Sequence, residues 1–178
     1  NVASYHWTVG GSSFDRGKSF DTLFASPGQQ KVSLVVTDKY NCVDTSSQTI
    51  IVSQPVALFT ADAPGVCENN TVTFNDGSTA DAGITLWLWD YGDGNTETSA
   101  ATPFTHQYTT AGSYAVKLTV KDDAGCTASY TLPANILVTA PKASFGTNTP
   151  MFCPGPALNL NDSSTGVGLK YLWTLGNG

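Results

Sequence analysis

The chain of 178 residues is long enough for one large domain or for two small domains, each with its own core. Only 12% of its residues are charged, and its net charge of −6 disfavours binding to nucleic acid or to anionic lipid. No apolar run approaches the roughly 18 residues that a membrane-spanning helix needs, and no helical spacing of apolar residues is sustained. The 17 glycines and 9 prolines instead favour short strands joined by turns.

Alternating apolar residues predict short strands with one buried and one solvent-facing side. In chain order, the clearest lie at residues 32–36, 71–75, 87–91, 114–120 and 136–138. Trp87, Trp89 and Tyr91 share one face of their strand, and Trp89 is expected to anchor the core. Gly92-Asp93-Gly94-Asn95 predicts a turn with glycines at positive φ. About seven such strands in roughly 85 residues predict an all-β fold, the immunoglobulin-like β-sandwich.

The chain also repeats itself, which indicates tandem modules of this kind. Residues 50–59 return as residues 136–145, an offset of 136 − 50 = 86, and Cys67 returns as Cys153 at the same offset. The aromatic strand occurs three times, at residues 5–10, 87–92 and 171–176. The repeat therefore predicts one complete module flanked by parts of two others.

The complete module is expected over residues 55–140. Because the aromatic strand lies inside a module, residues 1–54 are expected to be the C-terminal half of one module. Residues 141–178 are likewise expected to be the N-terminal half of another. Almost no linker separates the modules, and Pro55 stiffens the first junction. Modules joined in this way should stack end to end, each adding roughly 35–45 Å.

The central module carries a spaced set of aromatic, acidic and glycine residues. They are Trp89, Asp90, Tyr91, Gly92, Asp93, Gly94, His106, Tyr108, Gly112 and Tyr114. This pattern resembles the PKD (polycystic kidney disease) domain, in which W-D-F-G-D-G is followed by H-x-Y and then by G-x-Y-x-V-x-L-x-V. The resemblance implies an extracellular seven-stranded sandwich that serves in adhesion or spacing. The placement of the cysteines looks like that in PKD arrays of large secreted surface proteins of Bacteroidota, some of which resemble gliding-motility adhesins.

Four cysteines in such a chain suggest disulfide bonds. Cys67 and Cys126 are the two cysteines of the complete module, and we expect them to bond to each other. A loop of about 60 residues closed in this way would stabilise the module by ~4 kcal/mol in the chain-entropy model. Cys42 and Cys153 hold the equivalent positions in the partial modules, so their partners are expected outside these segments. No Cys-x-x-Cys motif or Cys/His cluster predicts a zinc site.

No sequence motif predicts an enzyme or a cofactor. His6 and His106 are the only histidines, and neither belongs to a hydrolase motif. In the repeat, His6 occupies the position of Leu88, which argues against a catalytic role. His106 lies beside Tyr108 of the PKD pattern and is expected to be a structural hydrogen-bonding residue.

A second hypothesis is that Asp90, Asp93, Asn95 and Glu97 offer oxygen ligands to calcium. Threonine replaces Asp90 in both partial modules. The favoured interpretation is therefore that the aspartates accept backbone hydrogen bonds in a tight turn, and no metal site is predicted.

Exposed aromatic residues are a third candidate for function, because aromatic rings can stack on sugars. Tyr40, Trp87 and Phe104 are the candidates, although packing within or between modules is the preferred explanation.

Taken with the repeat, these features predict a structural and adhesive segment of a large bacterial protein that is secreted or held at the cell surface. The expected partners are neighbouring modules of the same chain, with head-to-tail assembly and a surface glycan or protein ligand as further options. Neither nucleic acid nor membrane insertion is expected. The alternative is a carbohydrate- or protein-binding accessory module of a secreted degradative enzyme.

Overall fold

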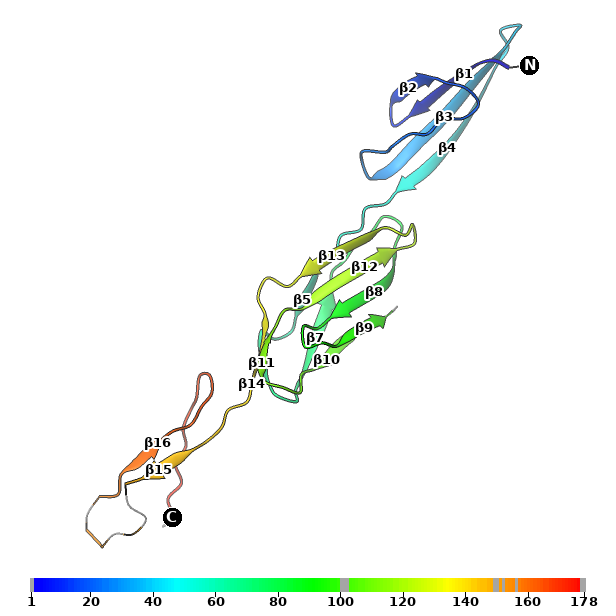
Figure 1. Cartoon of the computed structure of the whole chain (residues 1–178). Helices are drawn as coiled ribbons and strands as arrows, with labels where there is room; N and C mark the ends of the chain where they lie inside the picture. Colours follow the sequence, from blue (N-terminus) through cyan, green and yellow to red (C-terminus); the bar gives the residue numbers. More distant parts are fainter. Residues whose placement is uncertain (1, 100–102, 149–150, 152, 156, 177–178) are drawn as a thin grey trace.

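Strands make up the regular structure of the described residues. The computed structural model describes residues 2–99, 103–148, 151, 153–155 and 157–176. Its strands fall into three groups that follow one another along the chain (Figure 1). Within these described ranges, no helix is long and apolar enough to cross a membrane. The predicted all-β class is confirmed.

The first group is one antiparallel sheet with the strand order β2-β1-β3-β4. Its strands are β1 (Val2–Val9), β2 (Ser12–Asp15), β3 (Gly28–Asp38) and β4 (Val43–Val52). β3 and β4 form a long hairpin that pairs from Gly28 and Val52 to Thr37 and Val43. The predicted strand at residues 32–36 lies within β3, and its apolar side chains are only half-buried.

The central group is a complete sandwich. Its strand segments are β5 (Phe59–Ala61), β6 (Gly65–Cys67), β7 (Thr71–Asp76), β8 (Ile84–Asp90), β9 (Thr96–Ser99), β10 (Phe104–Gln107), β11 (Gly112–Tyr114), β12 (Lys117–Asp122), β13 (Thr127–Thr131) and β14 (Ile136–Thr139). β5, β7 and β10 form one sheet, and β9, β8, β12 and β13 form another. β11 and β14 continue the hairpin of β12 and β13, because Leu132 N donates to Val116 O across the break at 2.9 Å. β6 pairs in parallel with β14 at the edge.

Three chain courses of this sandwich are therefore each broken into two strand segments. They are β5 with β6, β11 with β12, and β13 with β14. Counted as whole courses, the central group has the predicted seven strands.

The core lies between these sheets and is built by the predicted alternation. Its buried members are Ala57, Phe59, Val72, Phe74, Trp89, Tyr91, Phe104, Tyr108, Val116, Leu118, Val120, Ile136 and Val138. Trp89 is fully buried, and its ring centroid lies 4.8 Å from that of Phe59, 5.3 Å from Phe74 and 5.1 Å from Phe104. The prediction that Trp89 anchors the core is confirmed.

The third group holds a two-stranded sheet of β15 (Phe145–Thr147) and β16 (Leu160–Asp162). Trp173 stands at the repeat position of Trp89 but remains 44% exposed, with only Phe145 as an aromatic neighbour at 5.4 Å among the described residues. The expected module boundaries at residues 54/55 and 140/141 stay a prediction.

The cysteines do not form the predicted bond, and all four are free thiols. Cys67 ends β6 beside Thr139, whereas Cys126 lies at the tip of the β12–β13 hairpin. From Thr127 to Thr139 the chain advances 139 − 127 = 12 residues. This course bends at residues 133–134, and the course paired with it advances only 121 − 112 = 9 residues, from Gly112 opposite Val138 to Lys121 opposite Thr127. At about 3.3 Å per residue, the two cysteines are therefore separated by roughly 30 Å. A disulfide needs Cα atoms within about 7 Å. The predicted bond between Cys67 and Cys126 of one module is therefore wrong.

Candidate functional site

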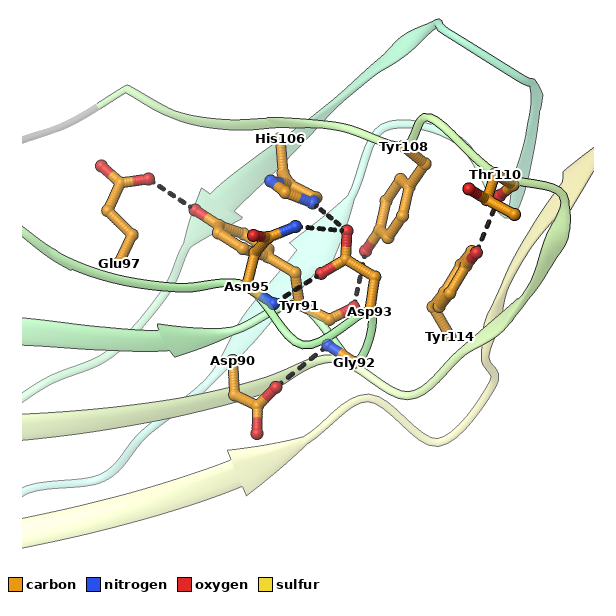
Figure 2. A network of polar contacts seen from close by, with 10 residues as sticks. All are labelled: Asp90, Tyr91, Gly92, Asp93, Asn95, Glu97, His106, Tyr108, Thr110 and Tyr114. Atoms are coloured by element: carbon orange, nitrogen blue, oxygen red, sulfur yellow. Dashed lines mark hydrogen bonds and ion pairs between the residues drawn. The ribbon is translucent and has the colours of Figure 1, made fainter.

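Seven residues of the sequence pattern lie around the turn that joins β8 to β9 and are drawn in Figure 2: Asp90, Tyr91, Gly92, Asp93, His106, Tyr108 and Tyr114. Gly94 lies in the same turn, Gly112 begins β11, and Trp89 lies in the core. Tyr91 N donates to Asn95 O at 3.2 Å and closes the turn. Two carboxylates stabilise the turn by accepting backbone hydrogen bonds. Asp90 Oδ1 accepts from Gly92 N, and Asp93 Oδ1 accepts from Asn95 N, both at 3.0 Å. Both glycines have positive φ, 81° at Gly92 and 93° at Gly94. The predicted turn is confirmed.

Asp93 ties this turn to β10. Its Oδ2 lies 2.7 Å from His106 Nε2 and accepts a second bond from Asn95 Nδ2 at 3.0 Å. The side chains of Asp93 and His106 are only 12% and 14% exposed. Burial raises the pKa of the Asp93 carboxyl, but the hydrogen bonds from His106 and Asn95 outweigh burial and hold this pKa below its ordinary value.

Aromatic rings extend the network through the sandwich end. The His106 ring stacks on Tyr91 at 3.9 Å and meets the edge of Tyr108 at 4.7 Å. Tyr108 in turn stacks on Tyr114, also at 4.7 Å. His106 thus has the hydrogen bond expected of it, together with two ring contacts that make it part of the packing.

Each of the three tyrosine hydroxyls donates to a specific oxygen. Tyr91 donates to Glu97 Oε2 at 2.9 Å, Tyr108 to the carbonyl oxygen of Tyr91 at 3.0 Å, and Tyr114 to the carbonyl oxygen of Thr110 at 2.7 Å. Burial is the main cause that raises the pKa of Tyr91 and of Tyr108, assisted by nearby carboxylates. Both hydroxyls therefore stay protonated and keep donating at neutral pH.

The same contacts bear on the calcium hypothesis. Asp93 uses both carboxylate oxygens for hydrogen bonds inside the turn, and Glu97 accepts from a buried tyrosine. Across the described ranges, no group of three or more His, Cys, Asp or Glu side chains is placed to hold a metal ion. The carboxylates act as acceptors for the turn, which is the chemistry that the favoured interpretation assigned to them.

Two of the three sugar-stacking candidates contact each other in the central group, and the third lies in the first group. Phe104 is buried, and its ring packs on Trp87 at 5.7 Å. The Trp87 indole N–H donates to Asp76 Oδ2 at 2.9 Å, so this ring is also fixed by the module's own packing. Tyr40 is 73% exposed at the tip of the β3–β4 hairpin in the first group. The structure therefore does not gather these rings into one platform.

One structural feature escaped the sequence prediction. Asp122 is buried, and its Oδ1 accepts a hydrogen bond from Cys126 N at 2.8 Å. Asp38 does the same for Cys42 N at 2.9 Å in the first group. The sequence signal for this turn is the aspartate four residues before Cys42 and again four residues before Cys126.

The Asp93 contacts predict a specific acid sensitivity. Because the folded pKa of Asp93 lies below the ordinary value of 3.8, its carboxylate stabilises the fold above that pH, and the contribution is lost as the pH falls through the folded pKa. The Asp93→Asn variant should therefore lose less stability than the parent chain between pH 7 and about pH 3. Urea unfolding of both proteins at the two pH values measures the difference. Asp81→Asn, at an exposed position, serves as the control and should keep the parent's acid sensitivity.

Comparison with known proteins places this site in a family context. Residues 52–138 match the family model described as the PKD domain. Pre-pro-metalloprotease PrtV of Vibrio cholerae serotype O1 is 41% identical over 88 residues, which cover 49% of this chain and 9% of that protein. A microbial collagenase of Vibrio alginolyticus is 41% identical over 78 residues, 43% of this chain and 9% of the collagenase. The chain thus spans about a tenth of the curated relatives it matches.

A solved structure is also similar to part of this chain. The crystal structure of the PKD1 domain from the Vibrio cholerae metalloprotease PrtV has 37% sequence identity and a TM-score of 0.39. The match covers 46% of this chain and 95% of that domain. These relatives come from Vibrio, so the narrower resemblance to Bacteroidota proteins gains no support from them.

Proposed function

Residues 52–138 are a PKD domain, and from this premise we propose that the chain is a structural and adhesive segment of a long extracellular stalk or fibre of tandem PKD modules. The observation that carries the proposal is the shortness of the junctions. β4 ends at Val52, and Val56 already bridges to Thr79 of the central group. β14 ends at Thr139, and Lys142 already bridges to Thr165 of the third group. Such short connections restrict bending between neighbouring groups. A stalk requires this stiffness.

The layout of the groups supports the same proposal. Figure 1 shows the three groups in a row, with the first and third on opposite sides of the central one. Ser53 Oγ at the first junction accepts a hydrogen bond from Ala82 N of the central group at 3.3 Å, which restrains that junction further. Neighbouring modules of the same chain are therefore the first partners that we propose.

The polar network also fits a spacer better than a catalyst. Its carboxylates, histidine and hydroxyls are engaged with one another and with the backbone, so they stabilise one end of the sandwich. A catalytic site would instead need a nucleophile, a base and an oxyanion site that converge on a substrate. We propose that this chain does no chemistry itself and acts outside the cell, secreted or at the surface.

A second candidate function rests on the relatives. The matched segments belong to a metalloprotease and a collagenase, of which this chain covers 9% each. This favours an accessory module, attached to a secreted degradative enzyme, that binds a carbohydrate or a protein. Collagen is the first ligand to test, because one relative is a collagenase.

Small-angle X-ray scattering of the whole chain tests the stalk directly. A compact protein of this length has a radius of gyration of about 16 Å. Three groups in a row, each roughly 35–45 Å long, should give about 30 Å and a maximum dimension above ~100 Å. A radius of gyration near 16 Å would overturn the stalk proposal.

Co-sedimentation with fibrillar collagen tests the second candidate function. A spacer should stay in the supernatant, whereas a collagen-binding module should pellet with the fibres.

A further inference from the structure

We propose that disulfide bonds staple consecutive modules together across their junctions. In each bond, the cysteine equivalent to Cys67 at the C-terminal end of one module joins the cysteine equivalent to Cys126 at the N-terminal end of the next. This inference rests on the proposed tandem array. It replaces the bond within one module, which the roughly 30 Å separation excludes.

The Cys126 turn presents its cysteine in a fixed way at the N-terminal end of the module. Asp122 N donates to Cys126 O at 3.0 Å, Gly125 N donates to Asp122 O at 3.0 Å, and Gly125 has a φ of 86°. With the buried Asp122 carboxylate holding Cys126 N, the turn is braced by three hydrogen bonds. In Figure 1 the tip of the β12–β13 hairpin lies at the end of the central group that faces β4.

The same turn recurs in the first group, which shows that it is a built feature of the module. Asp38 N donates to Cys42 O at 2.9 Å, Asn41 N donates to Asp38 O at 3.1 Å, and Asn41 has a φ of 64°. Asp38 Oδ1 accepts from Cys42 N at 2.9 Å. Cys42 is exposed, so each copy of the turn offers a thiol at the same end of its module.

Cys67 occupies the opposite end. It pairs with Thr139, the last residue of β14, directly before the junction to the third group. Its thiol is exposed. Cys153 is its repeat equivalent and lies between β15 and β16, also exposed. The central module therefore carries one thiol at each end.

The contacts at the first junction bring the two ends together. By the repeat offset, Ser53 is the equivalent of Thr139, and it accepts a hydrogen bond from Ala82 N at 3.3 Å. The next residue, Gly83, accepts one at 3.1 Å from Asp123 N, which lies in the turn that carries Cys126. Ser53, beside which a Cys67 equivalent would lie, is thus linked through its side-chain hydroxyl and the Ala82–Gly83 dipeptide to the Cys126 turn, by one hydrogen bond on each side of that dipeptide.

This arrangement explains why no pair meets in the described structure. The β12–β13 turn that carries Cys126 faces the first group (Figure 1), whose only cysteine, Cys42, lies in the β3–β4 turn, at the end of that hairpin opposite Val52. Cys67 faces the third group, where the only cysteine is Cys153. Cys153 sits at the Cys67 position, not at the Cys126 position. Each thiol therefore lacks its complement at the junction that it faces.

The bond-forming step needs an oxidant of the disulfide class. The two protein thiols lose two protons and two electrons and form one S–S bond. A small disulfide such as oxidised glutathione takes them up and is reduced to two thiols, by thiol–disulfide exchange through a mixed disulfide. Both cysteines are accessible enough for this exchange.

The test is the full chain with residues 55–140 duplicated in tandem, so that Ala140 is followed by Pro55 of the second copy. After oxidation with oxidised glutathione, alkylation and peptide mapping should find one bond, from Cys67 of the first copy to Cys126 of the second. Cys42, Cys153 and the two remaining cysteines should be found alkylated or as mixed disulfides with glutathione, not bonded to another cysteine of the chain. Apart from glutathione added at these unpaired thiols, the intact mass before alkylation should be lower by two hydrogens than that of the reduced chain.

Two serine variants are matched controls. Cys126→Ser in the second copy should abolish the bond, whereas the same change in the first copy should leave it intact. The backbone N–H of residue 126 still donates to Asp122 in both variants, so the turn is kept. Full alkylation of a folded chain, a bond within one copy, or disulfide-linked dimers would each overturn the staple. If X-ray scattering shows an extended particle but all thiols are free, the disulfide proposal fails and the stalk proposal stands. If scattering shows a compact particle, the stalk proposal itself fails.

Discussion

Trp89→Ala should lower the free energy of unfolding of the central module by about 3–5 kcal/mol. The Trp89 side chain is fully buried and contacts the rings of Phe59, Phe74 and Phe104, so its removal leaves a large cavity between the two sheets. Because domains of this size are stable by only about 5–15 kcal/mol, the loss would bring the module close to unfolding at room temperature. Urea unfolding of the full chain, followed by circular dichroism, measures it.

Trp173→Ala is the matched control, because Trp173 holds the same position of the repeat. It is 44% exposed and packs on Phe145 alone among the described aromatic rings. The transition of the central module should therefore stay within about 0.5 kcal/mol of the parent. If both variants shifted that transition equally, Trp89 would not be the anchor of the core.

The three copies of the aromatic segment show what sequence alone can and cannot predict. Residues 5–9 lie in β1 and residues 87–90 in β8, whereas residues 171–176 form no strand in the structure, contrary to the prediction. The alternating pattern predicts the facing of each side chain, because residues i and i+2 of a strand share a face. This places Val72 with Phe74, and Leu118 with Val120, correctly in the core. The alternation does not predict how deeply a side chain is buried. Trp89 is buried and Trp173 is half exposed, although their local sequences are nearly the same. The extent of burial depends on the second sheet, which lies elsewhere in the chain.

The contact between Asp93 and His106 illustrates a second limit. The sequence pattern contains both residues and suggests a hydrogen bond for His106. It does not identify the acceptor, because that depends on how β10 lies beside the turn after β8. In the structure the acceptor is Asp93, 2.7 Å away, and Tyr91 supplies the stacking face. Such register between strands of different sheets is a tertiary property.

The cysteines show how a repeat can mislead. The offsets identify Cys67 with Cys153 and Cys126 with Cys42 as equivalents, and the shared aspartate turn supports the second identification in the structure. The further step, that two cysteines of one module must bond, ignored the length of the hairpin between them. Equivalence between copies says which residues share a position, whereas a disulfide depends on distance.

Gly92→Ala should destabilise the central module by about 3 kcal/mol or more, far beyond an ordinary surface substitution. Gly92 has a φ of 81°, and a Cβ atom there would lie 2.5 Å from Ala115 O and 2.8 Å from Ala115 N. Both contacts are with backbone, which cannot move away as a side-chain end could. The turn would have to open, and the hydrogen bonds of Asp90 and Asp93 that brace it would weaken.

Gly94→Ala in the same turn separates this clash from the cost of the backbone conformation. Gly94 also has positive φ, 93°, but a Cβ atom there meets no heavy atom within 4 Å. Alanine at this position should cost only the about 1–2 kcal/mol of a left-handed residue. Urea unfolding of the two variants beside the parent chain should rank Gly92→Ala clearly below Gly94→Ala. Equal losses would mean that the approach of Ala115 contributes nothing, and that the requirement for glycine in this pattern is conformational alone.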